Sequence, residues 1–128
     1  MSWARQLTGS RAYGLAFTRI TSDGVVATLE HSTIEVNPNG ACHGGLVAAA
    51  IDQMMGVTAM TVLTPGHVPV TAALHVQFLS PAVPPLRLEG RVLRSGTSII
   101  SVDVDVYAEL GATVCAQGQG TMSPRRFT

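Results

Sequence analysis

The sequence is poor in charge and contains no lysine. Charged residues make up only 12% of its 128 residues, and eight arginines balance eight acids to a formal net charge of zero. Nucleic-acid-binding proteins usually carry a clear excess of basic residues, so this balance argues against a nucleic-acid partner. Because 46% of the residues are apolar, the composition favours a folded chain with little solvent-exposed surface, including contacts with further copies of itself.

Cysteine is also scarce. The two cysteines, Cys42 and Cys115, lie far apart and form neither a disulfide framework nor a CxxC metal or redox pair. The N-terminal residues MSWARQLT lack the apolar run and cleavage site of a secretory signal. We therefore expect reduced thiols and a cytoplasmic protein.

Long hydrophobic runs are nearly absent. Gly44 to Leu63 alone has the length of a membrane span, and Asp52 at its middle, next to Gln53, would be costly in lipid. We predict a buried helix there and no membrane partner. Without an internal repeat or linker, the chain is expected to form a single domain over residues 1–128.

What the sequence does contain is a regular series of short periodic segments. Tyr13–Ile20 and Gly24–His31 are rich in β-branched or aromatic residues and flank a Ser-Asp-Gly turn, which predicts a hairpin. The apolar stretch Leu46–Leu63, followed by Pro65-Gly66, predicts one long helix. The expected fold class is α+β, with a five- or six-stranded antiparallel sheet around this helix. Four further strands are predicted at Val70–Leu79, Leu86–Arg94, Ser98–Tyr107 and Thr113–Met122.

Alternation also predicts which side chains share a face of the sheet. In Val70–Leu79, the apolar positions from Val70 to Phe78 fall on one face, and Thr71, His75 and Gln77 fall on the other. This pattern indicates a half-buried strand. Asp103 and Asp105 alternate with valines in a later strand. We expect these two carboxylates to be solvated and assign them no acid/base role.

Asp52 is the anomaly of the predicted helix, which is apolar all round. A buried charge without a partner is energetically expensive. In a structural interpretation, Asp52 hydrogen-bonds a neighbouring backbone group or threonine hydroxyl and fixes the helix position. In a catalytic interpretation, partial desolvation makes the carboxylate a stronger base. The residues alone leave both interpretations open.

The loop that enters the helix is a second candidate site. Free N–H groups and the positive dipole end meet at a helix N-terminus, and Gly44 and Gly45 let a ligand approach closely, so an anion or developing oxyanion can bind. The alternatives are an ordinary helix entry and, for Asn37 and Asn39, turn chemistry. Asp52 lies eight residues, about 12 Å, beyond Gly44, too far to contact the same carbonyl. Two copies with antiparallel helices would bring the two residues together twice.

These residues resemble the hotdog-fold acyl-CoA thioesterases of the phenylacetic acid degradation (PaaI) type. The family pattern has Asn six residues before His-Gly-Gly and an acid nine residues after the His. Here these positions are Asn37, His43-Gly44-Gly45 and Asp52. The likeness extends from about Tyr13 to Met122 and includes Phe78-Leu79-Ser80-Pro81. It implies a hotdog fold, in which a sheet wraps around one central helix.

The resemblance implies hydrolysis of an acyl-CoA thioester to a free acid and CoA in a homodimer with shared active sites, often within a tetramer. The N–H of Gly44 would polarise the thioester carbonyl, supported by His43. Asp52 of the facing subunit would act as a general base or as a nucleophile. Asn37 would orient water or substrate, and Thr71 would position water. No cofactor is implied, because CoA is part of the substrate.

The phosphates of CoA are expected near an arginine. The resemblance suggests Arg94 with Ser95, Gly96 and Thr97, at a hairpin where the family often contacts the nucleotide, and a further substrate contact at Gly45. The alternative is a solvated turn. The family often has Lys or Arg directly after the hairpin glycine, where this chain has Thr97.

The sequence offers little support for other chemistries. A Cys42-His43 thiol dyad is disfavoured because adjacent side chains usually point apart. His31, His67 and His75 lack the spacing of a metal site. A hotdog dehydratase acting on 3-hydroxyacyl thioesters and a non-catalytic acyl-CoA-binding module remain the alternatives, although a binding module could dispense with Asp52. The acyl group itself, whether aryl, hydroxyaryl or a short or medium chain, stays open.

Overall fold

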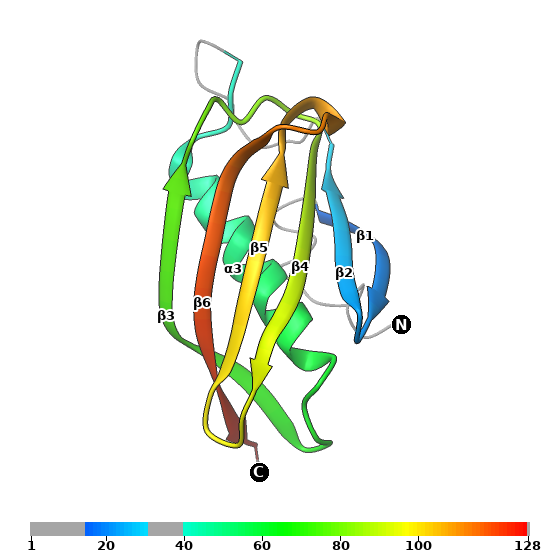
Figure 1. The fold of residues 1–128 in the computed structure, drawn as a ribbon, viewed down its shortest axis with the longest axis vertical. Helices are drawn as coiled ribbons and strands as arrows, with labels where there is room; N and C mark the ends of the chain where they lie inside the picture. Colours follow the sequence, from blue (N-terminus) through cyan, green and yellow to red (C-terminus); the bar gives the residue numbers. More distant parts are fainter. Residues whose placement is uncertain (1–14, 31–39, 128) are drawn as a thin grey trace.

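The computed structural model describes residues 15–30 and 40–127. Along the described chain, the strands and the long helix follow the predicted order β-β-α-β-β-β-β (Figure 1). A short 3₁₀ turn, η1 (Ala108–Leu110), precedes the last strand. The main elements are β1 (Leu15–Thr21), β2 (Gly24–Leu29), α3 (Gly44–Met60), β3 (His67–Phe78), β4 (Leu86–Ser95), β5 (Ile100–Tyr107) and β6 (Val114–Arg126).

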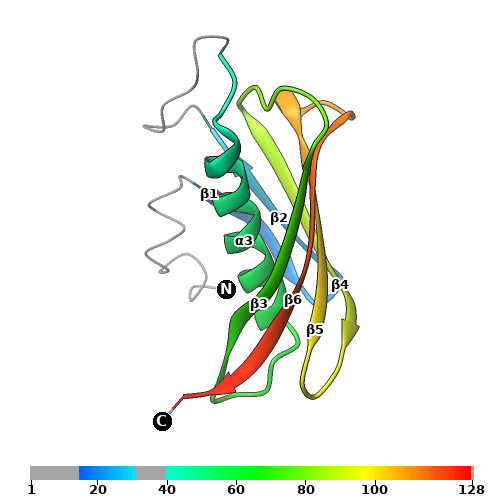
Figure 2. The ribbon, with the colours of Figure 1, turned by 90° about the vertical axis from the view of Figure 1, so that its left-hand side faces the viewer.

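The six strands form one antiparallel sheet in the order β1-β2-β4-β5-β6-β3. Figure 2 shows the sheet curving around α3, which lies along one of its faces. Because the connection through α3 carries the chain from β2 to the far side of the sheet, β1 and β3 are the two edge strands. The predicted α+β class is confirmed. In the described ranges, no helix is long and apolar enough to cross a membrane.

The core lies between α3 and the inner face of the sheet. Val47, Met54 and Val57 of the helix are buried there, as their shared helical face predicts. The close approach of α3 to the sheet depends on glycines of β6. A Cβ at Gly118 would collide with the side chain of Ile51, and a Cβ at Gly120 would collide with Met55. The absence of these side chains lets the helix lie directly on the centre of the sheet.

The ends of several elements differ from their predictions; β3, for example, begins at His67 and not at Val70. The helix begins at Gly44 and ends at Met60, and the residues up to Leu63 form a tighter turn. In that turn the N–H of Val62 donates to the carbonyl of Ala59 at 3.1 Å. Strand β6 continues to Arg126, beyond the predicted end at Met122, because its pairing with β3 persists after its own alternation has stopped.

Strand β3 is an edge strand, and nearly all of it is exposed in the single chain. The prediction of a half-buried strand is therefore wrong for one copy. Strict alternation also fails at Thr71, because the register shifts between Thr71 and Ala73. A bulge adds one residue to the strand and reverses the side on which a residue lies. Thr71 consequently pairs with the buried Met122 and faces α3, opposite to the predicted direction.

The burial of Asp103 also differs from its prediction. It was expected to be solvated, but only 3% of it is exposed. Arg91 lies opposite it on β4 and donates to its Oδ2 at 2.7 Å, whereas Oδ1 is buried without a partner in the described part of the chain. Asp105 is half-buried and accepts a hydrogen bond of 2.9 Å from Gln117. Neighbouring strands cover these side chains, which the pattern of one strand does not reveal.

Candidate functional site

Asp52 lies in the middle of α3 on the flank that faces the edge strand β3. Its side chain is half-buried, and the hydroxyl of Thr71 donates to its Oδ1 at 2.6 Å. The carboxylate therefore has the threonine partner that the structural interpretation required. This hydrogen bond is equally what a catalytic carboxylate needs, because it orients one oxygen and leaves the other available.

A groove runs beside this carboxylate, between the second half of α3 and the first half of β3. Apolar side chains dominate it, and Asp52 is the one charged group among the described residues that line it. A ligand in the groove would therefore meet a single carboxylate in mostly apolar surroundings. The lining consists of Asp52, Gln53, Gly56, Val57, Met60, Val68, Pro69, Thr71 and Met122.

The other predicted half of the site is the start of α3. His43 has extended backbone angles (φ −62°, ψ 143°), and its carbonyl accepts hydrogen bonds from Leu46 and Val47 at 3.0 and 3.1 Å. His43, Gly44 and Gly45 are exposed. Within the described ranges, nothing accepts a hydrogen bond from the N–H of Gly44 or Gly45. These two donors at the positive end of the helix are free to bind an oxyanion.

The segment after β3 holds the helix entry in place. The N–H groups of Leu79 and Ser80 donate to the carbonyl of Cys115 at 2.8 and 3.1 Å, and the N–H of Cys42 donates to the carbonyl of Ala82 at 2.9 Å. The ring of Phe78 lies against Gly44, where an added Cβ would be 3.3 Å from its Cζ. The Phe78-Leu79-Ser80-Pro81 motif was recognised in the sequence, but this positioning role was not.

One chain does not bring the two halves together. Gly44 and Asp52 belong to the same helix, eight residues and about 12 Å apart. Thr71 joins Asp52, whereas His43 and Gly45 stay with Gly44 at the helix start. Asn37 lies outside the described residues.

The β4–β5 hairpin lies at the opposite end of the molecule from the helix start (Figure 1). Its turn is closed by the N–H of Gly96, which donates to the carbonyl of Ile99 at 2.9 Å. Arg94 is exposed and pairs with Ser101, whereas Ser95 pairs with the buried Ile100. The side chains of Arg94 and Ser95 therefore lie on opposite faces of the hairpin. Ser95, Gly96 and Thr97 line a hollow together with His67.

The thiols do not form a second reaction centre. Cys42 and Cys115 are both buried and free. Burial raises the pKa of the Cys42 thiol, and it is also the main reason that the pKa of the Cys115 thiol is raised. The reactive thiolate form is therefore disfavoured at both positions. His43 is exposed while Cys42 is buried, which argues against a dyad. Among the described residues, no group of three or more His, Cys, Asp or Glu side chains is placed to hold a metal ion.

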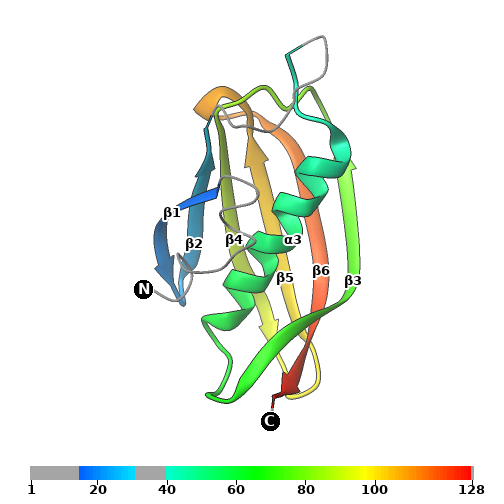
Figure 3. The same ribbon diagram turned by 180° about the vertical axis from the view of Figure 1, so that it is seen from behind.

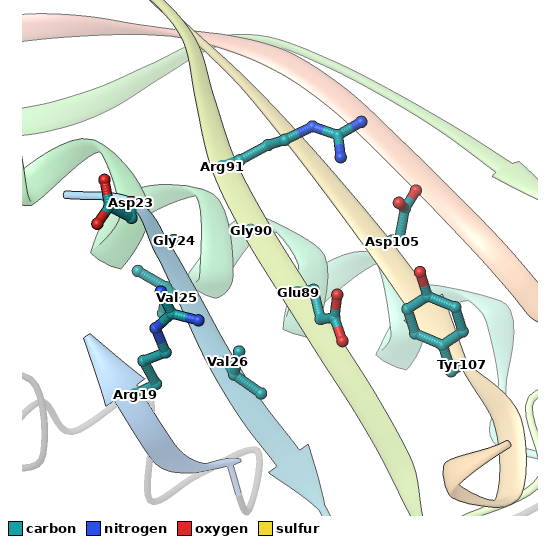
Figure 4. A pocket seen from close by; sticks show the side chains of 10 residues that line it. All are labelled: Arg19, Asp23, Gly24, Val25, Val26, Glu89, Gly90, Arg91, Asp105 and Tyr107. Atoms are coloured by element: carbon teal, nitrogen blue, oxygen red, sulfur yellow. The ribbon is translucent and has the colours of Figure 1, made fainter. Parts of the chain in front are cut away.

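Another hollow lies on the face of the sheet that points away from α3. Figure 4 shows its lining side chains on β1, β2, β4 and β5 and on the β1–β2 turn. The charges around it are of both signs, including Arg19, Arg91, Glu89 and Asp105. Because the sheet separates it from Asp52 and Thr71, this hollow is not part of the groove at α3.

Comparison with known proteins establishes the family. Residues 39–115 match the sequence model of the thioesterase superfamily. This range covers more than half of the chain and contains the helix entry, Asp52, Thr71 and the β4–β5 hairpin. The chain therefore belongs to the thioesterase superfamily.

A curated relative from Saccharolobus solfataricus, named "Putative esterase SSO2140", is 39% identical over 77 residues, which are 57% of this chain and 54% of that protein. The match thus spans about half of the relative's length.

Two solved structures are similar in fold. The first is a phenylacetic acid degradation-related protein from Ralstonia eutropha JMP134, named a "putative thioesterase", with a TM-score of 0.83 and 20% identity over 94% of this chain and 96% of that chain. The second is a hypothetical thioesterase protein with coenzyme A from Streptococcus pneumoniae TIGR4, with a TM-score of 0.76 and 21% identity over 88% of this chain and 89% of that chain. The arrangement of one helix and six strands is the hotdog fold.

Proposed function

We propose that this protein is an acyl-CoA thioesterase whose active site combines Asp52 of one copy with the helix entry of a second copy. The observation that carries the proposal is the Asp52–Thr71 hydrogen bond of 2.6 Å beside an open, largely apolar groove, in a chain of the thioesterase superfamily. The acyl group would be aryl or a short or medium chain.

In the general-base route, Asp52 accepts a proton from water while the water oxygen attacks the thioester carbon. The N–H of Gly44 donates to the oxyanion of the tetrahedral intermediate, where the positive end of α3 also stabilises the charge. The C–S bond then breaks, the CoA sulfur receives the proton from Asp52, and the free acid leaves. In the alternative route, Asp52 itself attacks and forms a mixed anhydride that water hydrolyses. Thr71 would orient the carboxylate in either route.

The need for a second copy follows from the geometry of one chain. The distance of about 12 Å between Gly44 and Asp52 prevents both from contacting one carbonyl. Strand β3 is a long edge whose outer backbone groups have no strand partner in the described part of the chain, and an antiparallel β3 from another copy would satisfy them. Large apolar side chains are exposed along this edge and just after it, at Val68, Val70, Leu74, Phe78 and Leu79.

The flank of α3 beside the groove supports the same arrangement. Ala48, Ala49 and Gly56 are small and only half-buried in the single chain. Small residues permit the close approach of an antiparallel helix, which would bring the helix entry of one copy to Asp52 of the other. Figure 3 shows that no described element lies over the face of α3 that points away from the sheet.

The carrier is proposed to be coenzyme A. The similar protein from Streptococcus pneumoniae was solved with coenzyme A, and the groove at Asp52 is open to solvent at the surface of this chain. A panel of acyl-CoA thioesters with detection of free thiol tests the activity. Enoyl product without thiol release would favour the dehydratase, and binding without either product would favour the binding module.

The Asp52→Asn variant tests the carboxylate. Its rate should fall by about 10²-fold or more, as expected for loss of an acid/base group. Asp105→Asn, which changes a half-buried carboxylate on the far face of the sheet, serves as the matched control and should keep its activity. Unchanged turnover in Asp52→Asn would refute the assignment.

Mixing two inactive variants tests the shared site. A dimer of Asp52→Asn with Gly44→Pro contains one site with both lesions and one site with neither. After subunit exchange, the mixture should recover about a quarter of wild-type activity, because half of the dimers are mixed and each has one intact site. A mixture that stays inactive while mixed dimers are demonstrably present would contradict a site shared between copies.

A further inference from the structure

The groove at Asp52 continues toward the C-terminal end of β6. Met60 and Val68, which line it, also line an adjoining hollow bordered by His67 and Phe127. Along α3 the path from Asp52 to Met60 is about 12 Å. Along β3 the path from Thr71 to His67 is about 13 Å. The groove at Asp52 and the hollow bordered by Phe127 therefore lie next to each other, with Met60 and Val68 between them.

Among the described residues, this end of the molecule carries positive charge with no carboxylate side chain in the neighbouring segments. Arg125 and Arg126 are exposed, and in the described part of the chain ion pairs form only at Arg87 and Arg91. Arg125 pairs in the sheet with Val68, and Arg126 pairs with His67, and both of these β3 residues line the hollow. As neighbours on one strand, the two arginine side chains leave opposite faces of the sheet edge, so they flank it from both sides. No Asp or Glu occurs in residues 61–68, 93–101 or 120–127. Unpaired guanidinium groups of this kind bind phosphate oxygens well.

An aromatic side chain stands beside the two arginines. Phe127 is 58% exposed although it is large and apolar. Its N–H donates to the carbonyl of Gly66 at 3.2 Å, which ties the end of β6 to the turn before β3. The hydroxyl of Thr64 lies 3.0 Å from Nδ1 of His67 in the same turn. An exposed ring next to arginines suits a nucleotide, because the base stacks on the ring while the guanidinium groups bind phosphate.

We infer that Arg125, Arg126 and Phe127 bind the 3′-phosphorylated ADP part of CoA, with the pantetheine arm lying in the groove that leads to Asp52. An acyl chain in the same groove would be uncharged at its far end and would gain nothing from the arginines. The inference rests on the proposed function for the thioester. It places the nucleotide at the end of β6, on residues that neither the sequence pattern nor the family comparison assigned.

The first test measures nucleotide binding without any reaction. Adenosine 3′,5′-bisphosphate is titrated into the wild type and into Arg125→Gln, Arg126→Gln and the double variant, with heat as the signal. Each substitution should weaken binding about tenfold, the effect of losing a hydrogen bond to a charged group. Arg19→Gln removes an exposed arginine on the opposite edge strand and is the matched control. Phe127→Ala should also weaken binding.

The second test uses hydrolysis. The kcat/KM for an acyl-CoA is compared with that for the same acyl group on pantetheine, which lacks the phosphates. The double variant should lose about 100-fold with the CoA thioester and nothing with the pantetheine thioester. Equal losses with both would overturn the nucleotide assignment.

The outcomes separate this inference from the proposed function. Failure of the wild type to bind the bisphosphate, equal weakening in Arg19→Gln, or equal affinity for inorganic phosphate would overturn the inference. The inference would also be overturned if the double variant kept its hydrolysis and its preference for CoA over pantetheine thioesters. That result would leave the proposed thioesterase function intact. Conversely, arginine-dependent binding of the bisphosphate without hydrolysis of any thioester would refute the thioesterase alone.

Discussion

At the scale of single residues, the site depends on a few polar groups in apolar surroundings. Asp52 is held by one short hydrogen bond from Thr71, and the N–H groups of Gly44 and Gly45 have no acceptor in the described chain. Catalysis by such groups depends on orientation, because donors must already point at the charge that develops in the transition state. Thr71 and Gly44 can therefore be tested separately.

Thr71→Val removes the hydroxyl and keeps the shape of the side chain. We expect kcat to fall about tenfold with little change in KM, because a hydrogen bond to a charged group contributes about 1.5–3 kcal/mol. Thr71→Ser retains the hydroxyl and should stay close to the wild type. Steady-state kinetics of the three proteins give the comparison, and equal rates in Val and Ser variants would show that the hydroxyl does not act through Asp52.

Gly44→Pro removes the proposed oxyanion donor at a position where proline is well tolerated. Gly44 is the first residue of α3, and His43 before it already has the extended angles that proline prefers in its predecessor. We expect a loss of about 10²-fold in kcat. Gly44→Ala places the same Cβ against Phe78 but keeps the N–H, so it should lose much less. Similar losses in both would indicate that only the space beside Phe78 matters.

At the scale of elements, the decisive contact is that of α3 with β6. Gly118 and Gly120 face Ile51 and Met55, and their missing side chains set the distance between helix and sheet. This distance positions Asp52 relative to Thr71, because Thr71 belongs to the strand that pairs with β6. A change in the packing of α3 should therefore affect both stability and the site.

Gly120→Ala tests this packing. The added Cβ would lie 2.5 Å from the backbone carbonyl oxygen of Ala73 and would also collide with Met55. We expect a loss of about 1–3 kcal/mol in the free energy of unfolding, the usual cost of overpacking. At Gly24 an added Cβ meets its nearest atom at an ordinary 3.5 Å, so Gly24→Ala is the control. Urea unfolding measures both, and equal stabilities would contradict the proposed close approach.

At the scale of the whole molecule, the core contains two buried thiols, one at the helix entry and one on the last strand. Cys42 precedes α3 and Cys115 lies on β6, and burial raises the pKa of both thiols above the ordinary value of 9.0. The folded chain keeps these protons to higher pH than the unfolded chain does. Their contribution to stability is therefore complete below about pH 9 and is lost as the pH rises toward the folded-state values.

Urea unfolding at pH 8 and pH 10 checks this sign. The free energy of unfolding of the wild type should fall over that interval, and Cys42→Ala/Cys115→Ala should show a smaller decline. The comparison concerns the change with pH, because the substitutions also leave small cavities. An identical decline in both proteins would assign the alkaline loss to other groups.

The sequence by itself determined the order of the strands along the chain, the long helix and the spacing of Gly44 and Asp52. These properties arise from neighbouring residues: the alternation of valines, the apolar run of the helix and the glycines at its start. Because α3 has a constant rise per residue, the sequence also predicts that a second copy brings the two groups to one carbonyl, and this stays a prediction.

Only the tertiary structure decided which distant segments meet. Pairing of β3 with β6 turned Thr71 toward Asp52 through a bulge, Arg91 on β4 buried Asp103, and a hollow bordered by Phe127 came to adjoin the groove at Asp52. In each case the partner lies on another strand, far away in the chain. A periodic pattern describes the faces of one segment, and it contains no information about the neighbour that will cover them.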